Sequence, residues 1–124
     1  MINLLRDTKE TAGIIIQFKE EILLLKRPSG TWAIPKGHIK EGESHYDGMI
    51  RELKEETQIE IKNNIMFLHC TRNKTRSVLY IYHYQSDIKI IPIINKEHTD
   101  WNYFSLNNLP NNLDYGLNKF LESR

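Results

Sequence analysis

The chain has 124 residues, 40% of them hydrophobic, and a formal net charge of +1; this length allows one compact domain with its own core and excludes two ordinary ones. The near-neutral charge excludes a basic surface that coats nucleic acid and also an acidic tail, so any anion binding has to come from local geometry. The single cysteine, Cys70, excludes an internal disulfide framework and favours a reducing compartment.

No segment of the sequence has the pattern of a membrane span or an export signal. The apolar runs fall short of the about 20 residues that cross a bilayer. The N-terminal stretch is charged too early for a secretory signal. We therefore expect a soluble, cytoplasmic protein, either a monomer or a homodimer, with no membrane partner.

The first predicted elements are two strands that form a hairpin. Residues 11–18 (TAGIIIQF) and 20–27 (EEILLLKR) are apolar, as buried strands are, and the short polar link between them favours a hairpin. Residues 28–30 (PSG) indicate a turn. Residues 32–35 (WAIP) form a short apolar approach to a loop that contains glycine.

A helix should follow this loop. Ser44 can cap its N-terminus, and Asp47, three residues on, has the position of the acidic member of a capping box. The helix should run through about Thr57, with Ile50 and Leu53 pointing toward a core.

The second half of the chain predicts further strands and a final helix. Residues 59–71 and 77–84 have strand character, residues 89–94 and 101–106 are shorter extended segments, and residues 113–121 carry apolar side chains at helical spacing. Because strands and helices are interleaved, we expect an α/β or α+β sandwich.

Three glutamates share one face of the predicted helix. Glu52, Glu55 and Glu56 are spaced i, i+3 and i+4 and should face solvent. One interpretation is a solvated surface on which Lys54 makes weak ion pairs. A divalent cation explains the convergence better, because Mg²⁺ takes oxygen ligands and shares them with substrate phosphates. The loop at Gly37 could then supply a backbone carbonyl and let a phosphate chain approach.

The same residues resemble the signature of the Nudix hydrolases. That signature is glycine, five residues, glutamate, seven residues, Arg-Glu-apolar-x-Glu-Glu-x-Gly-apolar, and residues 37–59 match eight of its nine specified positions. The exception is Gln58, where the signature has glycine. If the helix ends there in a left-handed conformation, Gln58 should cost about 1 kcal/mol of stability without loss of activity.

The resemblance implies a fold and a metal-dependent reaction. It implies a single domain over residues 1–124, an α/β/α sandwich with a mixed sheet and a glycine loop–helix–loop motif. It also implies cleavage of nucleoside diphosphates linked to another moiety, with Mg²⁺, or Mn²⁺ as a substitute. The implied metal ligands are Gly37, Glu52, Glu55 and Glu56, and the implied catalytic residues are Glu52, Glu55, Arg51 and Glu97. Arg51 would hold a glutamate in place. Glu97 is either a base or an ordinary loop carboxylate.

The form WAIPKGHIKEGE is most similar to the diadenosine polyphosphate hydrolase branch of that family. The resemblance suggests that Lys36 and His38 contact the phosphate chain, with help from Arg27. Tyr82 and its neighbours on one strand face could offer a ring for base stacking, although a place in the core explains at least two of these tyrosines equally well.

The expected substrate is therefore a nucleotide, most simply a dinucleoside polyphosphate such as diadenosine tetraphosphate. Removal of pyrophosphate or a cap from an RNA 5′ end, hydrolysis of another nucleoside diphosphate derivative, sanitising of oxidised nucleoside triphosphates and cleavage of inositol pyrophosphates remain alternatives. A degenerate nucleotide-binding module without activity is the alternative from another class. Fold resemblance alone does not decide among them.

Overall fold

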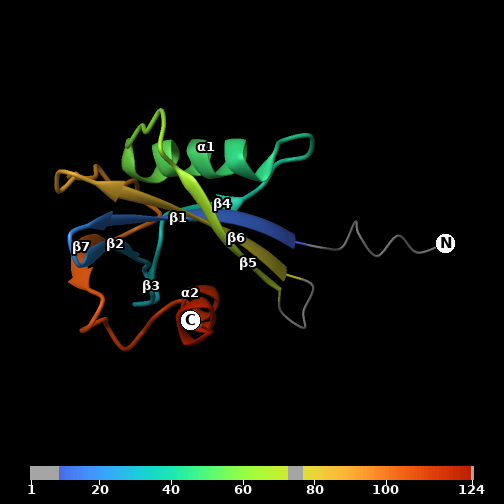
Figure 1. The fold of residues 1–124 in the computed structure, drawn as a ribbon. Helices are drawn as coiled ribbons and strands as arrows, with labels where there is room; N and C mark the ends of the chain where they lie inside the picture. Colours follow the sequence, from blue (N-terminus) through green and yellow to red (C-terminus); the bar gives the residue numbers. More distant parts are fainter. Residues whose placement is uncertain (1–8, 73–76, 124) are drawn as a thin grey trace.

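The computed structural model describes residues 9–72 and 77–123, which form one mixed β-sheet with a helix on each face (Figure 1). The predicted α/β/α sandwich is confirmed. No helix in the two described ranges is long and apolar enough to cross a bilayer. The strands are β1 (Lys9–Phe18), β2 (Glu21–Lys26), β3 (Trp32–Ala33), β4 (Lys36–His38), β5 (Met66–Arg72), β6 (Ser77–Ser86) and β7 (Asp100–Ser105), and the helices are α1 (His45–Thr57) and α2 (Tyr115–Glu122).

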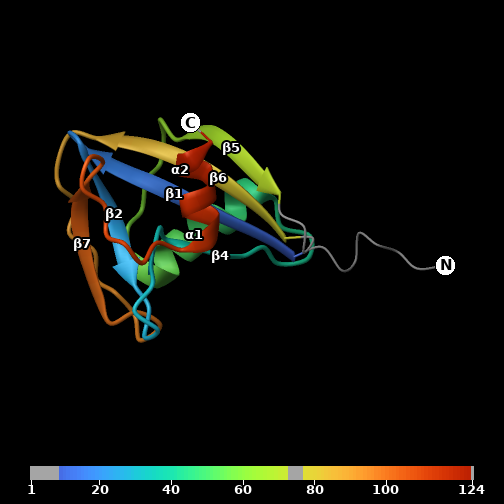
Figure 2. The same cartoon turned by 90° about the horizontal axis from the view of Figure 1, so that it is seen from below.

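Strand β1 is the centre of the sheet and changes partner along its length. On one edge it runs parallel to β6 over ten residue pairs. On the other edge its end pairs antiparallel with β2, which confirms the predicted hairpin, and its start pairs antiparallel with β4. The sheet continues from β2 to β3 and β7 and from β6 to β5 (Figure 2).

Strand β4 holds the glycine-containing loop against β1, and its pairing was missed in the sequence. The main-chain N–H of Ile14 donates to the carbonyl of Pro35 over 3.1 Å. Gly13 lies opposite Lys36, and a Cβ on Gly13 would lie 2.7 Å from the Cβ of Lys36. Glycine is therefore needed for this close approach, which places Lys36 and Gly37 on the rigid sheet instead of a loose turn.

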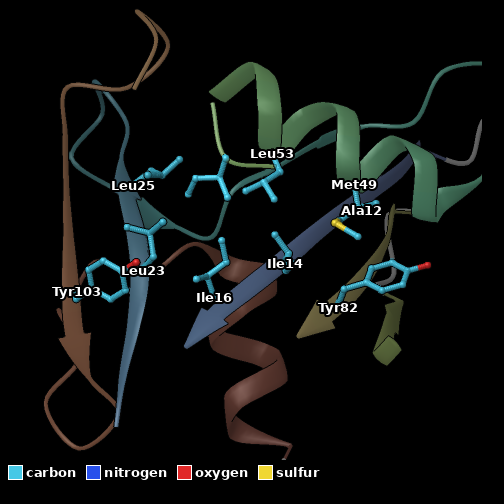
Figure 3. Close-up of a cluster of buried hydrophobic side chains, with 10 residues drawn as sticks. Ala12, Ile14, Ile16, Leu23, Leu25, Met49, Leu53, Tyr82 and Tyr103 are labelled. Atoms are coloured by element: carbon cyan, nitrogen blue, oxygen red, sulfur yellow. The ribbon is translucent and has the colours of Figure 1, made fainter. Parts of the chain in front are cut away.

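Two hydrophobic cores lie on opposite faces of the sheet. Alternate residues of β1 point to opposite faces, as in any strand, so Ile14 and Ile16 face α1 and Ile15 faces α2. Met49 and Leu53 of α1 pack onto the first face (Figure 3). The core on the second face consists of Ile15 together with Ile22, Leu24, Ile34, Leu79, Ile81, Leu117 and Phe120.

Helix α1 begins and ends where the sequence predicts. The side chain of Ser44 accepts a hydrogen bond from the main-chain N–H of Asp47 over 3.0 Å, which satisfies a free donor of the first turn. The helix ends after Thr57, and Gln58 has φ 59° and ψ 19°, a left-handed conformation. The N–H of Gln58 donates to the carbonyl of Lys54 and so closes the last turn.

Two predicted extended segments were wrong in part. The strand expected over residues 59–71 starts only at Met66, because Ile59 is buried beneath α1 and Asn64 adopts a left-handed turn with φ 64°. Residues 89–94 form no strand. They cover the edge of the first core instead, where the main-chain N–H of Ile93 donates to the carbonyl of Thr57 over 2.9 Å.

Gln58→Gly should stabilise the protein by up to about 1 kcal/mol, because glycine adopts the left-handed conformation without the Cβ clash. Chemical denaturation of the metal-free protein measures the difference. Gln58→Ala is the matched control: it keeps the Cβ and should leave stability nearly unchanged. An equal gain from alanine and glycine would show that loss of the Gln58 side chain, and not relief of backbone strain, is responsible.

Candidate active site

A pocket of about 530 Å³ opens beside β4 and the C-terminal half of α1. Its walls come from β1, the turn after β2, β4, α1 and the loop before β7. Positive side chains come from β4 and the turn after β2, and negative ones from α1 and the loop before β7. Seven of the ten predicted site residues line it: Arg27, Lys36, Gly37, His38, Glu52, Glu56 and Glu97.

Arg51 lies outside this lining and joins the glycine-containing loop to α1. Its Nε and Nη2 atoms donate to the two carboxylate oxygens of Glu43 over 2.8 and 3.0 Å. Its Nη1 atom donates to Glu52 over 2.9 Å and to Glu55 over 3.1 Å, and Nη2 also donates to the carbonyl of His38 over 3.0 Å. A planar guanidinium suits this bidentate arrangement better than an ammonium group would.

Glu52 packs against the main chain of Gly37. A Cβ at position 37 would overlap the carboxyl group of Glu52, so the glycine is needed here for space. Burial raises the pKa of Glu52, and the hydrogen bond from Arg51 only partly opposes this effect. The carboxylate of Glu52 is therefore held against the main chain of Gly37.

Glu56 is buried, with 5% of its surface exposed, which corrects the expectation that it faces solvent. One of its oxygens accepts the main-chain N–H of Lys36 over 3.1 Å. Burial raises the pKa of Glu56 to about 8; the N–H of Lys36 opposes the shift, and the nearby charges of Glu52 and Glu97 add to it. The pocket thus contains a carboxylate that is costly to ionise without an added positive charge.

The two cations of the pocket share one carboxylate that sequence reasoning missed. The Nζ atom of Lys36 lies 2.6 Å from Oδ2 of Asp114, and an Nη1 atom of Arg27 lies 3.3 Å from Oδ1. Burial lowers the pKa of Lys36, and the charge of Asp114 partly opposes this. Asp114 precedes α2 and has no motif around it, so only the fold brings it to the two cations.

The loop before β7 contributes Glu97 and His98 to the pocket wall. The N–H of Glu97 donates to the side-chain oxygen of Asn95 over 3.1 Å, and the side-chain amide of Asn95 donates to the carbonyl of Glu55 over 3.2 Å. Asn95 thus ties this loop to α1. His98 was also missed: its sequence context carries no signal, and its neutral form is favoured because burial lowers its pKa.

Two predicted residues lie elsewhere. Glu55 is half exposed and is held by Arg51, outside the lining of the pocket. The prediction that Tyr82 contacts the substrate is not supported, because its side chain lies in the core beneath α1 with 4% exposed (Figure 3). Its hydroxyl lies 2.6 Å from Nδ1 of His45, so the alternating pattern of β6 reflects packing against the helix.

The oxygen atoms at the pocket fit a hard divalent cation. Within residues 9–72 and 77–123, no three histidine, cysteine, aspartate or glutamate side chains already converge as a metal site. The carboxylate of Glu52 nevertheless lies against Gly37, and Glu56 is buried beside them. Burial dominates the raised pKa of both glutamates, and an ion that binds oxygen ligands would offset that cost.

Sequence comparison relates the chain to known proteins. The profile of the NUDIX domain matches residues 7–123. An uncharacterized Nudix hydrolase, YvcI, from Bacillus subtilis is 44% identical over 56 residues, which are 44% of this chain and 35% of that protein. The rat bis(5′-nucleosyl)-tetraphosphatase (asymmetrical) is 30% identical over 95 residues, which are 69% of this chain and 65% of the rat protein. The chain therefore matches less than two thirds of the length of these relatives.

Solved structures show the same fold. A MutT NUDIX hydrolase from Burkholderia pseudomallei superposes with a TM-score of 0.81 and 24% identity, over 93% of this chain and 96% of that one. An Ap4A hydrolase from C. elegans, solved as a binary complex, superposes with a TM-score of 0.62 and 25% identity, over 79% of this chain and 81% of that one.

Glu43 should make the protein sensitive to acid. The hydrogen bonds from Arg51 lower its pKa from 4.5 to about 2, so its stabilising contribution is present above pH 4.5 and is lost as the pH falls through about 2. Glu43→Gln should lower the melting temperature at pH 7, and the difference from wild type should vanish near pH 2. Glu41→Gln, at an exposed position, is the control and should follow wild type. A constant difference at all pH values would mean that the charge of Glu43 is not responsible.

Proposed function

This chain belongs to the Nudix domain family, and on that premise we propose that it is a Mg²⁺-dependent pyrophosphohydrolase of the cytoplasm that cleaves a phosphoanhydride bond of a nucleotide. Members of the family are hydrolases that act on pyrophosphate bonds of nucleotide-containing substrates. One observation carries the proposal: a single pocket is lined both by the carboxylates of Glu52 and Glu56 and by the cations of Lys36 and Arg27.

The acidic side of the pocket is suited to a metal ion. Glu52 and Glu56, together with the Gly37 carbonyl and with Glu55, which Arg51 holds outside the pocket lining, would hold Mg²⁺ or Mn²⁺. A bound divalent cation neutralises phosphate oxygens and lowers the pKa of water. Arg51 would keep Glu52 and Glu55 in place, because it already donates to both.

The remaining residues of the pocket would bind and orient the substrate. Lys36, Arg27 and His38 would contact the phosphate chain, which brings the scissile phosphorus in line with an attacking water. Glu97 would accept the proton of that water as its oxygen bonds to phosphorus. The phosphoanhydride P–O bond then breaks, and the leaving phosphate keeps the bridging oxygen.

We infer that the substrate is a dinucleoside polyphosphate such as diadenosine tetraphosphate. Two relatives support this choice: the rat protein is named a bis(5′-nucleosyl)-tetraphosphatase, and the C. elegans protein an Ap4A hydrolase. The pocket supports it as well, because two cations and a histidine line it, and a long phosphate chain carries enough negative charge to contact all three.

A panel of substrates tests the function directly. The purified chain is incubated with Mg²⁺ and dinucleoside polyphosphates, capped and triphosphorylated RNA 5′ ends, nucleoside diphosphate sugars, oxidised nucleoside triphosphates and inositol pyrophosphates. Products are identified by mass spectrometry in ¹⁸O water. We expect the fastest turnover on diadenosine tetraphosphate, with ¹⁸O in one product phosphate. Faster turnover on another class would reassign the substrate, and no turnover on any class would reject the enzyme.

Glu52→Gln and Glu56→Gln should each abolish most turnover, because each removes a charged metal ligand. Without metal, Glu56 destabilises the fold increasingly as the pH rises from 4.5 to about 8, since its pKa is raised in the folded state. Glu56→Gln should therefore melt at a higher temperature than wild type at pH 8 in EDTA, and Mg²⁺ should stabilise it less. Glu60→Gln, at an exposed position after the end of α1, is the control. Near-normal turnover of both variants at saturating Mg²⁺ would contradict the assignment.

Lys36→Ala should lose more kcat/KM on diadenosine tetraphosphate than on a nucleoside diphosphate sugar, because the tetraphosphate places more charge near the lysine. The expected loss is about one to two decades, as for a charged hydrogen bond, and Lys36→Arg should restore only part of it. Lys40→Ala, an exposed lysine of the same loop, is the matched control. A uniform loss under about twofold on all substrates would exclude contact between Lys36 and the phosphate chain.

A further inference from the structure

Asp114 is the one buried carboxylate, among the residues that the structure describes, that touches both cations of the pocket. It is 8% exposed. Its Oδ2 atom lies 2.6 Å from Nζ of Lys36, and its Oδ1 atom lies 3.3 Å from Nη1 of Arg27. Each oxygen thus faces a different cation, and the aspartate links Lys36 of β4 to Arg27, which directly follows β2.

The backbone around Asp114 is fixed from two sides. Its N–H donates to the carbonyl of Trp32 over 2.7 Å, and the N–H of Trp32 donates to the carbonyl of Asn112 over 2.7 Å. The carbonyl of Asp114 accepts the N–H of Asn118 in the first turn of α2 over 2.9 Å. The main chain of Asp114 is therefore anchored to β3, which is a strand of the sheet, and to α2, which packs against the sheet.

Lys36, one of the two cations that Asp114 contacts, has a flexible side chain. It ends in a compact ammonium on a flexible stem, but this side chain is only 13% exposed and its Nζ atom lies 2.6 Å from Asp114. A fixed carboxylate restricts where this ammonium can lie. The carboxylate also offsets part of the positive charge of Lys36. This weakens the attraction of Lys36 for any anion in the pocket.

We propose that Asp114 is a positioning residue of the phosphate pocket, which fixes Lys36 and Arg27 in the wall and moderates their hold on phosphate so that products can leave. This inference rests on the proposed function, since it assumes that the two cations face a phosphate chain. It gives a role in the site to the segment before α2, and this segment lies outside the glycine loop–helix motif.

A purely structural role is the alternative, because aspartate also favours the position that precedes a helix. Asp114→Asn separates the two roles: asparagine caps a helix as well as aspartate does, has nearly the same size and lacks the charge. Asp114→Ser, which keeps a capping oxygen, is the second variant if the first does not fold by circular dichroism.

Steady-state kinetics on diadenosine tetraphosphate test the proposal. Without the carboxylate, Lys36 should bind substrate and product more tightly without favouring the transition state, so kcat and KM should both fall, each by about three- to tenfold. In a Lys36→Met background the same change should alter both constants by less than about twofold. Glu60→Gln, which removes an exposed carboxylate paired with Lys54, is the control and should change neither constant.

The opposite results overturn the proposal. A structural role predicts a lower melting temperature with KM unchanged or raised, and the same fold-change with and without Lys36. No change in either constant also rejects it.

Calorimetry with inorganic pyrophosphate and Mg²⁺ separates this inference from the proposed function. If wild type binds pyrophosphate but hydrolyses no substrate, the proposed function fails, and tighter binding by Asp114→Asn, seen only when Lys36 is present, still supports the role of Asp114. Equal or weaker binding overturns that role. A wild-type chain that binds no pyrophosphate rejects both.

Discussion

The guanidinium of Arg51 joins the glycine-containing loop to helix α1, and the geometry of the acidic half of the pocket depends on it. It donates to Glu43 and to the carbonyl of His38 on the loop side, and to Glu52 and Glu55 on the helix side. One fixed cation thereby orders three carboxylates that would otherwise repel one another. Glu56 receives no such bond; it is held by the main chain of β4. The acidic face therefore combines three carboxylates that Arg51 holds with a buried one, Glu56, whose pKa burial raises to about 8.

Local patterns in the sequence predicted helix α1 and the polar residues around it. The cap at Ser44, the left-handed exit at Gln58 and the β1–β2 hairpin depend on residues close together in the chain, so spacing and side-chain type suffice. The same is true of the face shared by Glu52 and Glu56. Spacing shows on which side of the helix a side chain lies, but not how deeply that side is buried. The burial of Glu56 could therefore not be predicted from the sequence.

Contacts between distant residues account for what could not be predicted. Asp114 meets Lys36 across 78 positions of sequence, and β4 joins the sheet only because β1 leaves half of one edge free. Tyr82 lies on an alternating strand, a pattern that fits a binding surface and a core equally well until the helix above it is placed. These features depend on which elements pack together, and a local sequence pattern does not show which elements will do so.

The contact between Gly37 and Glu52 restricts how the sequence of this site can change. Any side chain at position 37 would occupy the space of the carboxyl group at position 52, so a single substitution at position 37 displaces the glutamate from its place beside the loop. A larger residue at position 37 would need a shorter residue at position 52 in the same step. If the glutamate at position 52 is needed for activity, a replacement at position 37 is therefore selected against even when no residue at position 37 itself contacts the substrate.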